Sequence, residues 1–189
     1  MVGVRVVFLE APEQLLAERR RLGLDGRDEM WEGELHMVPP PSFGHQEREM
    51  AIAASLAPIA RHLGLRAATE AGLYAGDKSW RVPELVVARP EHVVHRGVEG
   101  GAVLVVEIRS PDDETDAKIP FYARFGVEEL LIVDRDTAAV ELRTNVDGEL
   151  VAVPHEEDGW VTCSLGVAFR QAAENVLEIR LPDGRIEAC

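Results

Sequence analysis

The sequence predicts a fold of the α+β or mixed α/β class. Two long amphipathic stretches with helix start and stop signals are separated by several short apolar runs of strand length. The strands do not alternate strictly with helices, which argues against a doubly wound parallel sheet, and the helices exclude an all-β fold. The 189 residues are 46% hydrophobic, enough to bury a full core in a single domain spanning 1–189.

The N-terminal part, about residues 1–28, is expected to be an arm and a helix ahead of a core over about 29–181. Val4–Leu9 is predicted as a short strand or ordered arm. Pro12–Leu22 is predicted as a helix, because proline suits the first turn and Gly23 suits the end. Met30–Val38 alternates apolar and polar residues around Glu32-Gly33, which predicts a tight hairpin.

A long helix is expected after the prolines that end this hairpin. Ser42 is a plausible N-cap, and the helical pattern continues to about Leu63. Pro58 lies inside this stretch and should kink it, because proline has no N–H to donate. The face predicted to be buried carries the apolar residues of the stretch: Met50, Ala53, Leu56, Ile59 or Ala60, and Leu63.

The remaining elements are mostly strands. The run Ala102–Ile108 is almost continuously apolar, as expected for a strand covered on both faces. A helix is predicted over Asp112–Phe125, interrupted at Pro120 and ended by Gly126. The other predicted strands are 65–73, 84–88, 129–133, 139–143, 149–153 and 176–181, with turns at 145–148 and 182–184.

Composition excludes several classes of protein. The formal net charge of −14 argues against a dedicated non-specific nucleic-acid binder, although an enzyme that cuts nucleic acid needs only a local cationic groove. Two cysteines cannot form a disulfide framework or a four-cysteine zinc site. No apolar run approaches the ~18 residues of a membrane span, and the first residues lack a signal-peptide pattern, so a cytoplasmic protein without membrane association is expected.

Two carboxylates interrupt strongly apolar strands. Glu84 opens one strand after Pro83, and Glu107 lies near the end of Ala102–Ile108. An ionised carboxylate beside so much apolar surface needs a cation or hydrogen bonds. If the two are neighbours, they form a hard-oxygen site of the kind that Mg²⁺ or Mn²⁺ prefers. The non-functional alternative is that both side chains face solvent at the ends of their strands.

A lysine in the following helix is the candidate cation. All but two of the 20 basic residues are arginine, the exceptions being Lys78 and Lys118. Lysine is a compact, titratable ammonium, whereas arginine is a planar fork of fixed charge, so a retained Lys118 fits a chemical role. Such an ammonium could orient or help to deprotonate water, or stabilise transition-state charge. The alternative is a surface lysine that pairs with Glu114 one helical turn away.

The pattern of residues resembles the Uma family of restriction-endonuclease-like proteins, within the PD-(D/E)xK nuclease superfamily. The resemblance covers about residues 12–180, and its most specific block runs from Val106 to Asp134. The matching features are 31–35, 39–42, His45, 83–84, 106–111, Asp116, Lys118, Tyr122, 125–127, Glu129 and 133–134.

This resemblance implies a restriction-endonuclease-like fold, α/β (mixed α+β), with a central mixed sheet flanked by helices. It also implies a phosphodiesterase that requires Mg²⁺ or Mn²⁺ and acts on nucleic acid. In the family pattern the metal-binding acids map to Glu84 and Glu107, the catalytic lysine to Lys118, and an additional acid of the hairpin to Glu34. The chain departs from the pattern at Glu84, where the family usually has Asp. The extra methylene moves the carboxylate by roughly an ångström, and Mg²⁺ has strict geometric demands.

Two further residues are candidate auxiliaries. His45 lies near the start of a helix, where capping is the alternative role, and Arg109 occupies the position where many members of the superfamily carry their lysine. Two hypotheses follow: a metal-dependent endonuclease, or a catalytically inactive binding or scaffold member of the same fold. A homo-oligomer is expected under either hypothesis.

Overall fold

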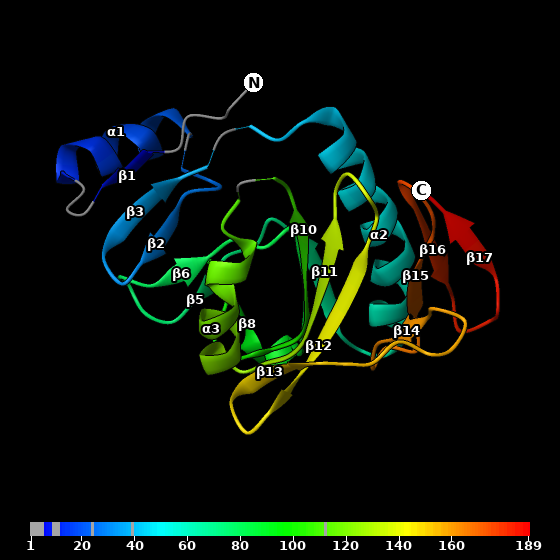
Figure 1. Cartoon of the computed structure of the whole chain (residues 1–189). Coiled ribbons are helices and arrows are strands. Elements are labelled where there is room, and N and C mark those ends of the chain that lie inside the picture. The colour runs from blue at the N-terminus through cyan, green and yellow to red at the C-terminus, as the bar shows by residue number, and fades with distance from the viewer. Residues whose placement is uncertain (1–5, 9–11, 24, 39, 112) are drawn as a thin grey trace.

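Three helices and three sheets make up the computed structural model, which describes residues 6–8, 12–23, 25–38, 40–111 and 113–189 (Figure 1). The helices are α1 (Glu13–Leu22), α2 (Phe43–His62) and α3 (Thr115–Phe125), with a 3-10 turn at Pro90–His92. Among the described residues, none of the helices combines the length and apolarity needed to cross a membrane.

The central sheet is mixed, as the family resemblance implies. Its strand order is β13-β12-β11-β10-β7-β4, in which β10 and β11 are parallel and the other neighbours antiparallel. The strands are β4 (Arg66–Thr69), β7 (Leu85–Ala88), β10 (Ala102–Arg109), β11 (Val127–Asp134), β12 (Val140–Val146) and β13 (Glu149–Ala152).

A second sheet lies at the N-terminal side and a third at the C-terminal side. The second has the order β1-β3-β2-β6-β5-β9-β8 and contains the predicted hairpin, β2–β3. Its strands are β1 (Val6–Phe8), β2 (Glu29–Trp31), β3 (Glu34–Met37), β5 (Leu73–Tyr74), β6 (Trp80–Arg81), β8 (Val93–Val94) and β9 (Gly97–Val98). The third sheet comprises β14 (Val161–Thr162), β15 (Ala168–Ala173), β16 (Val176–Arg180) and β17 (Ile186–Ala188), and only β16 was expected from the sequence.

The two faces of the central sheet are covered by different elements (Figure 1). Side chains of β7 alternate between them, so that Val87 packs in a core with Leu56 of α2 and Phe169 of β15. Val86 packs in a second core with Tyr122 of α3. Because β10 is buried by both layers, its near-continuous apolar sequence is explained.

The predicted buried face of α2 is partly wrong. Leu56 and Ala60 are buried as expected, but Met50 is 68% exposed and Leu63 is 51% exposed. The buried stripe instead continues into the first turns through His45, Arg48 and Glu49. Those turns run past the edge of the apolar sheet, where Arg48 donates to the carbonyl of Asp134 and to Asn175, so polar side chains are required there.

Local signals predict other boundaries with mixed success. Ser42 accepts a hydrogen bond from the His45 amide as the N-cap of α2, and Gly126 ends α3 in the left-handed conformation. Pro120, however, lies within an uninterrupted α3. The predicted strand 65–73 is two strands in two sheets, since the chain turns at Glu70, whose φ is 51°. Of the expected N-terminal arm, residues 4, 5 and 9 lie outside the described residues, as does the first residue of the predicted 112–125 helix.

Truncating a side chain on the buried face of α2 should lower stability far more than truncating one on its exposed face. Leu56→Ala leaves a cavity in the core and should lower the free energy of unfolding by ~2–5 kcal/mol. Met50→Ala, on the exposed face, should change it by no more than ~0.5 kcal/mol. Urea titration measures both, and equal losses would contradict the packing of this helix.

Candidate active site

Glu107 is buried near the end of β10. Its side chain lies on the face of the sheet that α3 covers, and the residue is 1% exposed. The carboxylate accepts a hydrogen bond from the Tyr122 hydroxyl and contacts Lys118 Nζ at 3.2 and 3.4 Å. Lys118 and Tyr122 are four residues apart in α3, so both side chains leave the same face of the helix toward Glu107.

The Lys118 ammonium binds a second carboxylate from the hairpin. Lys118 Nζ lies 2.9 Å from Glu29 Oε1, and Glu29 is also 1% exposed. Glu29 is held by two further donors, the Val82 amide at 2.9 Å and the Trp31 indole N–H at 2.8 Å. The hairpin, β10 and α3 therefore meet at one buried cation.

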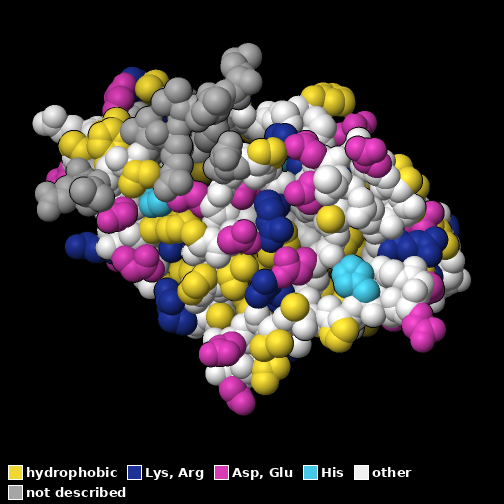
Figure 2. Space-filling view, viewed as in Figure 1, with side chains coloured by type: hydrophobic (Ala, Val, Ile, Leu, Met, Phe, Trp, Pro, Cys, Tyr) yellow, Lys and Arg dark blue, Asp and Glu magenta, His cyan; other side chains and the backbone are white. Residues whose placement is uncertain are grey.

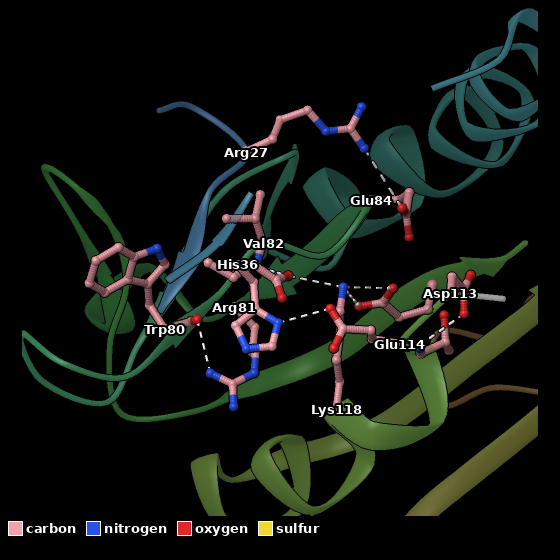
Figure 3. A network of polar contacts seen from close by, with 12 residues as sticks. Arg27, His36, Trp80, Arg81, Val82, Glu84, Asp113, Glu114 and Lys118 are labelled. Atoms are coloured by element: carbon pink, nitrogen blue, oxygen red, sulfur yellow. Dashed lines mark hydrogen bonds and ion pairs between the residues drawn. The ribbon is translucent and has the colours of Figure 1, made fainter. Parts of the chain in front are cut away.

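Glu84 completes the group of acids. It directly precedes β7, and its Oε2 accepts a hydrogen bond of 2.9 Å from the Ile108 amide, next to Glu107 in the adjacent strand. Its Oε1 lies 3.2 Å from His45 Nε2. The same oxygen lies 3.9 Å from an Arg27 nitrogen (Figure 3). Glu29, Glu84 and Glu107 are called the carboxylate cluster below.

Burial and neighbouring charges shift the pKa values of Glu107, Glu84 and Lys118. Burial raises the pKa of the Glu107 carboxyl well above its ordinary value, against the opposing effect of Lys118. Burial also acts to raise the pKa of Glu84, but His45, Lys118 and the Ile108 amide stabilise its carboxylate, so this pKa is lowered. Burial acts to lower the pKa of Lys118, but the three acids outweigh it, so the ammonium stays protonated above its ordinary range.

A stack of planar side chains supports the hairpin behind Glu29. The Arg81 guanidinium lies 4.1 Å from the Trp31 ring centroid and 4.4 Å from that of Phe121 in α3. Trp31 stacks on His36 at 4.2 Å, and His36 Nδ1 lies 2.9 Å from Glu114 at the start of α3 (Figure 3). The stack therefore ties the strands that carry Glu29 to the helix that carries Lys118.

The structure brings together most of the residues singled out in the sequence. Glu84, Glu107 and Lys118 meet as expected, and His45 contacts Glu84. Arg109 does not join them, because its guanidinium pairs with Asp116 at 2.8 Å and Glu141 at 3.3 Å.

The hairpin acid in the cluster is Glu29 rather than Glu34. Glu34 is exposed opposite Trp31, next to the turn. Sequence reasoning missed Glu29, although it precedes the apolar Met30 in the same hairpin. It also assigned no role in the site to Tyr122 or Arg27. Their contacts with Glu107 and Glu84, which are far from them in sequence, show that they lie at the site.

The carboxylate cluster has the right donor chemistry for a divalent metal. Carboxylate oxygens are the ligands that Mg²⁺ and Mn²⁺ prefer, and Glu29, Glu84 and Glu107 bring three carboxyl groups close to Lys118. In the part of the chain that the structure describes, no three His, Cys, Asp or Glu side chains are already gathered at metal-binding spacing. The ligand type of these acids suits the ion, while in this structure Glu29 and Glu107 are paired with Lys118.

Comparisons with known proteins identify the family and the fold. The model of the Uma2 family, described as "Putative restriction endonuclease", matches residues 12–174. A solved structure described as a putative nuclease belonging to DUF820, from Anabaena variabilis, matches with a TM-score of 0.60 and 19% identity over 74% of this chain and 83% of that one. A comparison with curated proteins finds no match. The structural likeness establishes the fold that the sequence predicts.

Removing the buried cation should destabilise the protein in a pH-dependent way. In Lys118→Met the acids lose their partner, their pKa values rise, and the folded state binds more protons than the unfolded state, so stability falls as pH rises. We expect a loss of ~3–5 kcal/mol at about pH 8 and a smaller loss at about pH 5. Urea titrations at the two pH values measure this.

The matched control is Lys78→Met, which replaces the chain's other lysine at an exposed position. It should change stability by no more than ~0.5 kcal/mol at either pH. A pH-independent loss in Lys118→Met would contradict the buried ion pairs.

Proposed function

The chain belongs to the Uma2 family, and from this premise we propose that it is a divalent-metal-dependent nuclease that hydrolyses phosphodiester bonds at the carboxylate cluster. One observation carries the proposal: Glu107 and Glu29 enclose a buried Lys118, with Glu84 held beside them. A buried acid whose pKa is raised well above its ordinary value, as that of Glu107 is, beside a buried lysine is typical of a site of chemistry.

Glu84 and Glu107 are the residues that would hold Mg²⁺ or Mn²⁺. They come from adjacent strands, and the Ile108 amide orients Glu84 while Tyr122 orients Glu107. When bound, the metal supplies Lewis-acid polarisation of a phosphoryl oxygen and lowers the pKa of water. Glu84 reaches the site with the longer side chain that replaces the usual Asp, and its two oxygens already face donors, which fixes its position.

Lys118 acts as a fixed positive charge. Its raised pKa keeps it protonated, so it orients water and stabilises the negative charge that develops on the phosphate, rather than removing a proton. Glu29 positions the ammonium, because the Val82 amide and the Trp31 indole N–H hold the Glu29 carboxylate in place. His45, beside Glu84, is a candidate positioning residue for that acid.

The substrate we propose is a nucleic acid, as the family description implies. The net charge of −14 means that attraction must be local. On the face seen in Figure 2 basic side chains lie singly among acids, without a continuous basic stripe. This surface favours recognition through a restricted site over broad electrostatic binding.

The second candidate is a non-catalytic, oligomeric module of the same fold. It is favoured by the engagement of Glu29 and Glu107 with Lys118, which satisfies these charges without a metal. This candidate expects a folded wild-type protein that neither binds Mn²⁺ nor cleaves any nucleic acid.

Neutralising Glu107 should separate the two candidates. Glu107→Gln keeps the shape of the side chain and removes its charge, so Mn²⁺ affinity should fall at least ~10-fold and metal-dependent cleavage should be lost. Calorimetric titration of Mn²⁺ and a screen of single- and double-stranded DNA and RNA measure these, with circular dichroism to establish folding. A folded variant with wild-type affinity and cleavage would contradict the proposal.

A paired substitution tests which hairpin acid serves the site. Glu29→Gln removes a charge 2.9 Å from Lys118 Nζ and should lower metal-dependent cleavage at least ~10-fold. Glu34→Gln, at the exposed position four residues before Val38, should leave the rate unchanged. If Glu34→Gln slowed cleavage and Glu29→Gln did not, Glu34 rather than Glu29 would serve the site.

A further inference from the structure

One face of α2 is exposed along the whole length of the helix and carries few charges. Its residues recur at intervals of three or four positions, so their side chains lie on one side of the helix. The opposite side, which contains Leu56, packs on the central sheet (Figure 1). The exposed face is called the α2 stripe below and consists of Phe43, Glu47, Met50, Ala54, Pro58 and Arg61.

The composition of the α2 stripe is unusual for a surface that faces only water. The solvent face of a surface helix normally carries mainly charged and polar residues. Here Phe43 is 83% exposed and Met50 is 68% exposed, whereas only Glu47 and Arg61 are charged. Large apolar side chains that are aligned and exposed in this way indicate contact with a partner.

The two charges of the α2 stripe have no partner within the chain. Among the described residues, the side chains of Glu47 and Arg61 make no hydrogen bond or ion pair. Every other described arginine except Arg66 makes at least one such contact. Glu47 and Arg61 are also too far apart to pair with each other, since they are separated by ~21 Å along the helix axis.

A second copy of α2 that runs antiparallel to the first would satisfy both charges. Ala54 lies midway between Glu47 and Arg61, seven positions from each. A two-fold rotation centred on Ala54 therefore places Glu47 of each copy opposite Arg61 of the other, so the same ion pair forms twice. The small side chain of Ala54 lets the helices approach at their crossing, and Met50 and Pro58 lie on either side of it. Opposite charges at equal distances from a central residue favour a second copy over an unrelated partner.

We propose that the α2 stripe is the contact surface between two copies of this chain, which form a two-fold symmetric dimer through antiparallel α2 helices. None of the six residues of the stripe belongs to the carboxylate cluster, so the proposal does not depend on the nuclease function. A single pair of helices is a small interface, and the dimer is therefore expected to be weak and in rapid exchange with the monomer.

Charge reversal tests both the surface and its register. Glu47→Arg and Arg61→Glu each place like charges opposite one another in a homodimer, so each should raise the dissociation constant at least ~10-fold. An equimolar mixture of the two variants should regain wild-type association, because every opposed pair then joins an acid to a base. Sedimentation velocity up to millimolar protein concentration measures wild type, variants and mixture, with circular dichroism to establish folding.

The matched control is Arg66→Glu, which reverses the other unpaired arginine at a position in β4, outside the α2 stripe. It should associate as the wild type does. The proposal would be overturned by a wild-type protein that stays monomeric at millimolar concentration. Wild-type association by both single variants, or a mixture that associates no better than its components, would overturn it equally. No metal or nucleic acid enters this measurement, so its outcome is separate from that of the nuclease tests.

Discussion

The ion pairs of Lys118 with Glu107 and Glu29 are the interaction on which the site and its surroundings depend. Both carboxylates are almost completely buried, and uncompensated charges there would cost several kcal/mol each. The ammonium removes that cost only if the hairpin, β10 and α3 are brought together. A local electrostatic requirement thereby sets the relative placement of three elements that are distant in sequence.

The surrounding contacts serve the same placement. Trp31 bonds Glu29 and stacks between Arg81 and His36, while His36 reaches Glu114 at the beginning of the helix that carries Lys118. Glu84 comes from the start of the neighbouring strand, and the backbone amide of Ile108 orients its carboxylate. Catalysis by positioning and electrostatics requires side chains that are held rigidly by hydrogen bonds and packing of this kind.

Sequence patterns predict the core of this arrangement because a charged residue in an apolar strand needs a partner. That argument finds Glu84 and Glu107, and the scarcity of lysine finds Lys118. The choice between Glu29 and Glu34 depends on strand pairing and on the position of the hairpin turn, which periodicity does not determine. Only tertiary contacts reveal that Tyr122 and Arg27 belong to the site.

The fold was predictable to a similar depth. Caps and glycines indicate the ends of the helices, and the apolar run indicates β10. The buried face of α2 was misjudged at Met50, since hydrophobicity alone does not say where a helix leaves the sheet and begins to contact polar loops. The C-terminal sheet was mostly missed because its strands are short and β15 ends in an exposed polar stretch.

The most direct test of the central claim is anomalous X-ray scattering from crystals grown with Mn²⁺. If the carboxylate cluster is a metal site, one strong anomalous peak should lie within coordination distance of both Glu84 and Glu107, with Lys118 beside it. A well-ordered crystal with no peak there, or with Mn²⁺ bound only elsewhere, would contradict the account and leave the buried charges a structural role.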